Sequence, residues 1–146
     1  MEKQYIDFDI LKIKSLKDEY EENIEWILEV LPIGVNYNSP KQIRALLEER
    51  LDITTKHVRI SELEVWRDFY DHDSQEFDLL NGIVLYLKCK FILSNYINCI
   101  LKHEENGRVY LRFENGEWLM PNKRPISDSP QIIACITGKF VPVRYQ

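Results

Sequence analysis

Ser39, Lys41 and Gln42 combine helix-capping chemistry with a charge that suits an anion. Ser39 is placed as the N-cap of a helix, with Pro40 at the first helical position. Gln42 stands at the third position, so the hydroxyl and the amide can each accept an unpaired backbone N–H. Free N–H groups at a helix start, together with a nearby ammonium, favour a phosphate. A capped helix with a solvated lysine explains the same residues, so both interpretations stay open.

Catalytic and metal-binding chemistry finds little support elsewhere in the chain. The three histidines have no metal-ligand spacing, no nucleophile stands in a recognisable elbow, and adjacent acids such as Glu48 and Glu49 are typical of solvated helix surfaces. The acidic run from Asp71 to Glu76 is interpreted as a polar loop and helix start. The three cysteines lack the spacing of a zinc site or a disulfide framework, and we expect them to be buried. We therefore predict no catalytic residue, no metal and no cofactor.

The composition is that of a soluble globular protein. A chain of 146 residues, 45% hydrophobic and 29% charged, can bury a proper core and form one domain with at most a small appendage. We expect no apolar stretch long enough to span a bilayer. The N-terminus also lacks the basic start and apolar core of a signal peptide. A cytoplasmic location without membrane contact is therefore predicted.

The net charge of −5 is unevenly distributed along the chain. Residues 1–30 hold 9 acids against 4 bases, residues 31–83 hold 10 against 6, and residues 84–146 hold 5 against 9. Only the C-terminal part could therefore offer a basic face for phosphates. The candidates for such a patch are Arg108, Arg112, Lys123, Arg124, Lys139 and Arg144. A scattered set of solvated charges is the alternative.

Apolar periodicity predicts four helices. The first covers residues 10–31 with Asp9 as its N-cap, and the second covers residues 40–51. The third begins at Ser61, which forms a candidate capping box with Glu64. The longest runs over residues 74–103 and carries two apolar stripes, so burial on more than one side is expected.

A β-hairpin is predicted after the longest helix. Val109, Leu111 and Phe113 alternate with polar residues, and Asn115-Gly116 supplies a turn before the apolar pattern returns. The fold class is therefore α+β and mostly α-helical, with antiparallel helices and a small C-terminal hairpin. We expect a helical domain of residues 1–105 and a hairpin-containing tail of residues 106–146, packed on it as one unit.

The run from Asn36 to Ile43 resembles the Asn-x-Asn-Ser-Pro-Lys-Gln run that opens a thumb helix in family A DNA polymerases, the bacterial DNA polymerase I type. Other segments resemble motifs of this family in the same order, with Tyr5 in place of a glycine and an insertion before the last segment. These segments are Met1-Glu2 with Ile6, Phe8, Asp9 and Leu11; Ser94-Asn95-Tyr96; Asn106 to Tyr110; Arg124 with Ser127 and Pro130; and Val141 to Arg144. The resemblance covers nearly the whole chain.

This resemblance implies a thumb-like fold with the segment that leads into the palm, and a binding function. The family's metal-binding aspartates and nucleotide-gripping helix have no counterpart here, so a non-catalytic protein is expected. Thumb helices of the family lie along the minor groove of the primer–template duplex and hold its phosphates. The implied DNA-binding residues are Ser39, Lys41, Lys88, Lys90, Asn95, Arg108 and Arg124. The partner would be primer–template DNA or the separate catalytic chain of a split polymerase.

The sequence departs from the family where its long thumb helix carries an arginine and lysines. Leu87, Phe91 and Leu93 occupy those positions, and Lys88 and Lys90 are displaced by one residue, which is about 100° of rotation on a helix. Such an apolar surface marks a partner interface if it is exposed and a core if it is buried. The alternative function is a repurposed polymerase fragment that acts as a protein-interaction factor, for example a small viral protein that engages or inhibits a host enzyme, without binding DNA.

Overall fold

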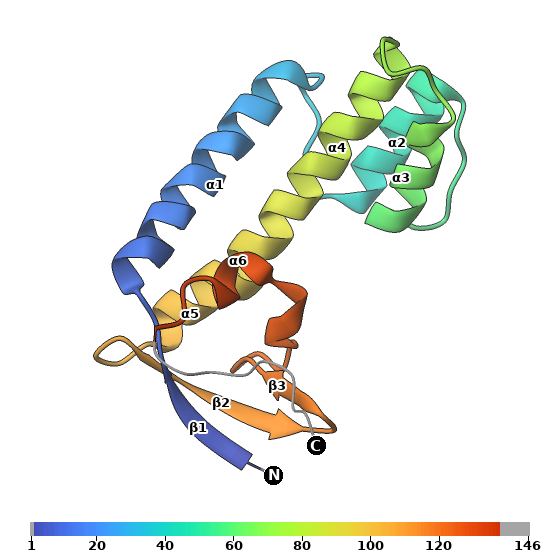
Figure 1. The fold of residues 1–146 in the computed structure, drawn as a ribbon. Coiled ribbons are helices and arrows are strands. Elements are labelled where there is room, and N and C mark those ends of the chain that lie inside the picture. The colour runs from blue at the N-terminus through green and yellow to red at the C-terminus, as the bar shows by residue number, and fades with distance from the viewer. Residues whose placement is uncertain (1, 138–146) are drawn as a thin grey trace. The chain divides into compact units, whose positions relative to one another are not determined.

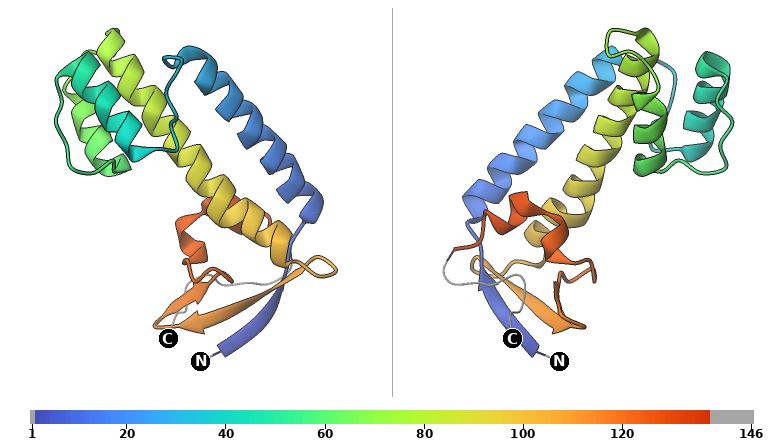
Figure 2. Two further views of the ribbon diagram at one scale, coloured as in Figure 1. Left: turned by 180° about the vertical axis from the view of Figure 1, so that it is seen from behind. Right: turned by 45° about the vertical axis from the view of Figure 1, so that its right-hand side comes forward.

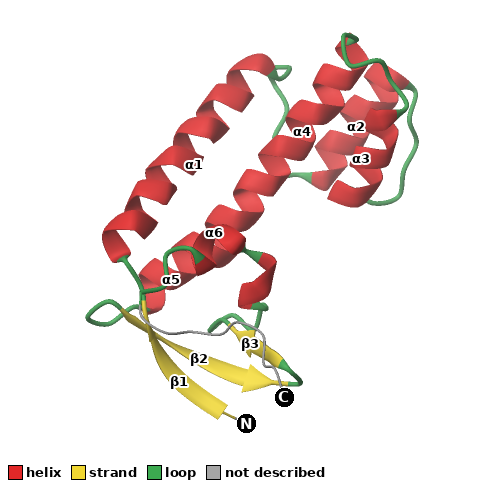
Figure 3. Cartoon of the chain, in the orientation of Figure 1, coloured by secondary structure: helices red, strands yellow, loops and turns green. Residues whose placement is uncertain are grey.

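A computed structural model of the chain describes residues 2–137 (Figure 1). Met1, Lys139, Arg144 and the polymerase-like segment from Val141 to Arg144 lie outside the described residues. The chain is α+β and mostly helical, as the sequence predicted. All the described strands form one small sheet, and helices and loops make up the rest (Figure 3).

Cα proximity groups the chain into two compact units. The sheet unit comprises Met1–Glu21 and Phe91–Gln146, and the helical unit comprises Glu22–Lys90. Helix α1 (Ile10–Val30) and helix α4 (Gln75–Ile92) each contribute residues to both units. This division differs from the boundary expected after residue 105, because the N-terminal strand and the start of α1 group with the C-terminal part.

The sheet unit is built on three antiparallel strands in the order β1-β2-β3. The strands are β1 (Glu2–Asp7), β2 (Arg108–Glu114) and β3 (Glu117–Leu119). The predicted hairpin is β2 and β3, and both of its turn residues have positive φ, 51° at Asn115 and 82° at Gly116, as a tight hairpin turn requires. β1 adds a neighbour on the other side of β2, and the views of Figure 2 show the two strands side by side.

The remaining elements of the sheet unit follow α4 and the hairpin. A π-helical turn, η1 (Leu93–Ile97), leads into α5 (Asn98–His103). The 3₁₀ turn η2 (Ile126–Asp128) and the short helix α6 (Pro130–Ile133) come after β3. The unit's core is formed by side chains that are almost completely buried: Ile13, Tyr96, Ile97, Ile100, Val109, Leu111, Met120, Ile126 and Ile132.

The helical unit contains α2 (Pro40–Leu51), α3 (Ile60–Asp68), the end of α1 and most of α4. Its core includes Ile43, Leu47, Leu63, Leu80, Ile83 and Val84. Gly82 stands out in α4, because a Cβ atom there would lie 2.7 Å from Cδ2 of the buried Leu31. The glycine therefore permits a close approach that offsets its poor helix propensity, about 1 kcal/mol against alanine.

Two of the three predicted helix caps are present. Asp9 Oδ1 accepts the backbone N–H of Lys12 at 3.1 Å, and Ser39 Oγ accepts that of Gln42 at 3.3 Å. Ser74 lies just before α4 instead of within it, and its Oγ accepts the N–H of Phe77 at 3.1 Å. The prediction of a capping box formed by Ser61 and Glu64 is wrong. Helix α3 begins at Ile60, and its N-cap residue makes no side-chain capping hydrogen bond. Ser61 lies inside the first turn and is exposed, so its hydroxyl is not in the N-cap position.

The helical stretch Gln75–His103 corrects the expectation about membrane-spanning length. It is long and apolar enough to cross a bilayer, by length and composition alone. The reason is that Lys88 and Lys90 are the only charged residues between positions 79 and 101. In the structure 44% of its most apolar stretch is buried, and the core helix of a soluble protein can be equally long and apolar.

Candidate functional site

Asn95 lies at the centre of a hydrogen-bonded cluster in the sheet unit. Its Oδ1 accepts a hydrogen bond from Arg124 Nε at 3.1 Å, and its backbone carbonyl accepts one from Asn122 Nδ2 at 2.7 Å. The Arg124 guanidinium also stands over the ring of Phe91, 4.8 Å from its centroid. We call Phe91, Asn95, Asn122 and Arg124 the polar cluster. It joins the end of the long helical stretch to the loop after β3.

Asn95 lies in the π-helical turn, and its side chain also bonds to the helix itself. The side-chain Nδ2 of Asn95 donates to the carbonyl of Phe91 at 3.0 Å, four residues back, which is where a regular α-helix places a backbone N–H. Single π-helical turns often occur at functional sites. From this turn the carbonyl of Asn95 accepts from Asn122, and its side-chain amide orients Arg124.

Tyr96 secures the loop that carries Arg124. Its ring is fully buried, and its hydroxyl donates to the carbonyl of Pro125 at 2.8 Å. Burial raises the pKa of the Tyr96 hydroxyl, so it stays protonated and able to donate at neutral pH. Within the loop, the N–H of Met120 donates to the carbonyl of Arg124, and that of Lys123 donates to the carbonyl of Met120, both at 2.8 Å. Arg124 is therefore presented from an anchored, tightly turned loop.

Arg124 keeps an unneutralised charge at the surface. It is exposed, and no carboxylate in residues 2–137 forms an ion pair with it. Asn95 takes its Nε–H, so the two terminal nitrogens remain available as donors on the described surface. A planar guanidinium held in this way suits a phosphate or another oxyanion.

The other predicted residue of the sheet unit is partly neutralised. Arg108 Nε lies 2.9 Å from Asp7 Oδ1, and both side chains are more than half exposed. Arg112, from the wider candidate patch, lies 3.9 Å from Glu114. Of the predicted basic patch within the described residues, Lys123 and Arg124 thus form the exposed, unpaired part.

In the helical unit, the Asn-x-Asn-Ser-Pro-Lys-Gln segment mostly bonds to itself. Ser39 Oγ accepts the N–H of Gln42 at 3.3 Å, as predicted, whereas Gln42 Oε1 accepts the N–H of Asn36 at 2.7 Å. Asn38 accepts the hydroxyl hydrogen bond of Tyr86 at 2.8 Å, which fixes the segment to α4. Since Pro40 has no N–H, the first turn of α2 offers an anion little beyond the backbone N–H and the exposed ammonium of Lys41.

The predicted residues on the long helix fall into different environments. Lys88 Nζ lies 3.1 Å from Glu64 Oε2, so its charge is paired, and Lys90 is partly buried. Leu87 and Phe91 are also partly buried, while only 7% of Leu93 is exposed. Leu93 is therefore part of the core and not of an exposed partner interface. The ring of Phe91 lies under the guanidinium of Arg124.

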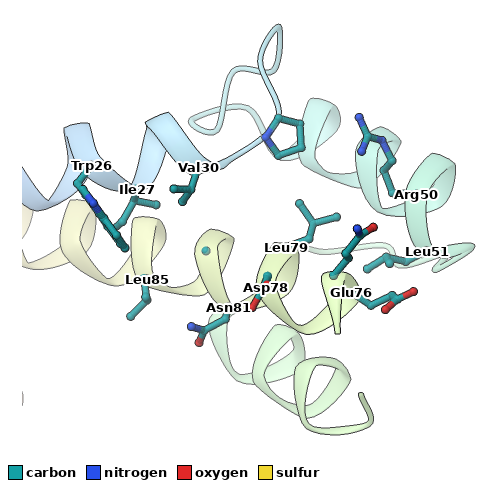
Figure 4. Close-up of a pocket in the computed structure, with 13 residues that line it drawn as sticks. Trp26, Ile27, Val30, Arg50, Leu51, Glu76, Asp78, Leu79, Asn81 and Leu85 are labelled. Atoms are coloured by element: carbon teal, nitrogen blue, oxygen red, sulfur yellow. The ribbon is translucent and has the colours of Figure 1, made fainter. Parts of the chain in front are cut away.

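Sequence reasoning missed a groove in the helical unit. It has a volume of about 580 Å³ and is bordered by the end of α1, the end of α2 and the first turns of α4 (Figure 4). Trp26 and Val30 stand on its rim, 63% and 64% exposed, with Leu85 at 40%. Trp26 and Val30 are four residues apart on α1, outside its buried stripe. That spacing was the signal that could have revealed the groove.

No group of His, Cys, Asp or Glu within residues 2–137 could hold a metal ion. Burial raises the pKa of each of the three free cysteine thiols, Cys89, Cys99 and Cys135. Comparisons of the chain with protein-family models, with curated proteins and with solved structures find no match.

Proposed function

We propose that this protein is a non-catalytic, thumb-like relative of family A DNA polymerases that binds a primer–template DNA duplex. One observation carries the proposal: Arg124 and Asn95, 29 residues apart in the chain, are hydrogen-bonded at 3.1 Å at the surface. They come from two separate motifs of the polymerase resemblance, which implies a DNA contact for each. Their proximity is what two parts of one DNA-binding surface require.

The local structure of the other motifs supports the same proposal. Pro40 opens a helix, Asn95 lies in the last turns of a long helical stretch, and Arg108 begins a strand, as the resemblance implies. Lys123 stands where the family has a glycine, and its φ of 71° lies in the left-handed region that glycine adopts readily. A non-glycine residue therefore retains a glycine-type backbone conformation at this position.

In the proposed interaction Arg124 is the principal phosphate contact. Phe91 supports the guanidinium from below and Asn95 fixes its orientation, so little side-chain freedom remains to be lost on binding. Such contacts position a protein on a duplex without reading its sequence. Lys41 and Lys90 are the secondary candidates, because Lys88 and Arg108 already have acidic partners. A separate polymerase chain would supply the chemistry.

The experiment is fluorescence anisotropy of a labelled primer–template duplex titrated with the full chain over a salt series. We expect binding that weakens with salt, because each phosphate contact adds about −0.9 to the slope of log K against log salt. Arg124→Ala should weaken binding by about tenfold, corresponding to about 1.4 kcal/mol, and reduce the slope by about 1. Asn95→Ala should act in the same direction, since it frees the guanidinium.

The matched control is Arg59→Ala, which removes the same charge from an exposed ion pair with Glu62 in the helical unit. It should leave the affinity within about twofold, as expected for an exposed pair of small energetic value. Non-specific DNA affinities usually include dissociation constants of about 50 micromolar. Absence of binding at low salt up to that protein concentration would therefore contradict the DNA proposal. Equal losses of duplex affinity in Arg124→Ala and Arg59→Ala would show that the polar cluster is not the DNA-binding site.

The alternative proposal is a protein-interaction factor, such as an inhibitor of a host enzyme, that does not bind DNA. The observation that favours it is the groove of the helical unit, with Trp26 and Val30 exposed on its rim. It predicts no salt-dependent binding of the duplex, so the same titration separates the two proposals.

A further inference from the structure

The groove of the helical unit exposes more apolar surface than its own fold needs. Trp26, Val30 and Leu85 border a single cavity, whereas its floor is completed by less exposed side chains such as Ile27 (Figure 4). Large apolar side chains that gather at one concave site, instead of being scattered singly, mark interaction sites on protein surfaces. Its volume of about 580 Å³ lies within the range of pockets that enclose drug-sized groups. One or two large side chains of a partner would fill it.

The charged residues around the groove indicate which charge a partner would carry. The helical unit, Glu22–Lys90, contains 13 acids and 8 bases, so it carries 8 − 13 = −5, the same as the net charge of the whole chain. Glu76 and Asp78 line the groove from α4, and Arg50 is its one basic lining residue. On α1, Glu22 and Glu29 stand four residues before and three residues after Trp26, which places them on the same side of the helix.

A second copy of this chain is a poor occupant, because the groove of one copy would meet the equally acidic groove surface of the other. A nucleic acid is a worse one, since its phosphates would meet the same carboxylates. Charge complementarity instead selects a basic partner, and the apolar rim selects one with large apolar side chains.

We propose that this groove docks a protein segment that presents one or two large apolar side chains flanked by lysine or arginine. The apolar side chains enter between Trp26, Val30 and Leu85, and the flanking cations face Glu76, Asp78 and the glutamates of α1. The inference does not depend on DNA binding, because no residue of the polar cluster lines the groove.

The probe is a random 12-residue peptide library displayed on phage and selected against the immobilised full chain. Selected peptides are then synthesised with a fluorophore and titrated by anisotropy. We expect enrichment of Trp, Phe or Leu next to Lys or Arg. Trp26→Ala should weaken the binding of these peptides by at least about tenfold, the loss of affinity typical of an aromatic anchor that is buried in an interface. Val30→Ser, on the same rim, provides a second and milder variant.

A charge variant and a control complete the design. The double variant Glu76→Gln and Asp78→Asn should weaken binding about threefold to tenfold and reduce its salt dependence. Leu11→Ala is the control, since Leu11 is 79% exposed but belongs to the sheet unit. Circular dichroism verifies that each variant is folded.

Several outcomes would overturn the inference. They are a library without selectable peptides, selected peptides without basic residues, and peptide affinity that Trp26→Ala and Val30→Ser leave unchanged in folded protein. A concentration-dependent dimer that Trp26→Ala dissociates would show that a second copy occupies the groove. The primer–template titration should be unaffected by Trp26→Ala, so failure of this inference is distinguishable from failure of the proposed DNA binding.

Discussion

The sheet unit and the helical unit differ in charge and in exposed apolar surface. Met1–Glu21 and Phe91–Gln146 hold 11 bases and 11 acids, so the sheet unit is neutral, whereas the helical unit carries −5. Eight of the eleven large apolar side chains exposed in the described residues belong to the helical unit. The polar cluster and the groove therefore arise in different chemical surroundings. One suits an anion, and the other suits a basic segment with apolar side chains.

The two units are alike in how they hold their surface features in place. In the sheet unit Tyr96 donates to the Pro125 carbonyl beside the polar cluster. In the helical unit Tyr86 donates to Asn38, and Tyr37 donates to the Pro32 carbonyl at 2.7 Å. In each case a buried ring with one hydrogen bond fixes a loop to a helix or to a neighbouring turn. We therefore expect the cores of the two units to be similarly well packed, although their surfaces differ in charge and apolar exposure.

The largest effect should come from truncating one core leucine in each unit. Leu80 and Leu111 are both completely buried, the first in the helical unit and the second in the sheet unit. Leu80→Ala and Leu111→Ala should each lower the free energy of unfolding by about 2–5 kcal/mol, through lost apolar burial and the cavity left behind. Urea unfolding followed by circular dichroism measures both. A loss well below this range in one variant would mean that one core is loosely packed.

A smaller effect should separate the two tyrosines by function. Tyr96→Phe and Tyr86→Phe each remove one hydrogen bond from a buried hydroxyl, which should lower stability by about 0.5–1.5 kcal/mol. Only Tyr96→Phe should also weaken duplex binding, because it loosens the loop that presents Arg124. Thermal unfolding and duplex anisotropy on both variants test this. Equal duplex affinity of the two would argue against a role for the Tyr96 anchor.

The smallest effect is expected at Lys123. Its φ of 71° is strained for a residue with a Cβ atom, so Lys123→Gly should relieve that strain. The greater flexibility of glycine in the unfolded chain opposes the gain, and the net increase in stability should be about 0–1 kcal/mol. Thermal unfolding measures it. A clear loss of stability would indicate that the lysine side chain makes a stabilising contact.

Local features of the fold were predictable because the signals lie within a few residues. Asp9 and Ser39 cap helices as predicted, and Asn115-Gly116 forms the expected turn. Strand β1 was not predicted, because its residues Glu2–Asp7 are mostly polar and its pairing partner lies about a hundred residues away. The hydrogen bond between Asp7 and Arg108 joins residues 101 positions apart. No local sequence pattern predicts the pairing register of strands that are so far apart in the chain.

The candidate site was only half predictable for a related reason. Asn95 and Arg124 were identified separately, but Asn95 lies in a π-helical turn, and apolar spacing does not distinguish a π turn from an α turn over five residues. Arg108 was identified, although its pairing with Asp7 requires β1 to be in place. The groove escaped because Trp26 and Val30 lie away from the buried stripe of α1. Their spacing was a signal, but the sequence alone does not show the concave surface that residues of α2 and α4 form beside them.

The segment from Asn36 to Gln42 uses its polar side chains within the fold. Asn36, Asn38 and Gln42 direct their side chains to the chain itself, to one another's backbone or to Tyr86. These amides attach the loop to its helices whether or not the protein binds DNA. A substitution in this segment would therefore disturb the fold as well as any binding, and a test of ligand binding belongs at Arg124.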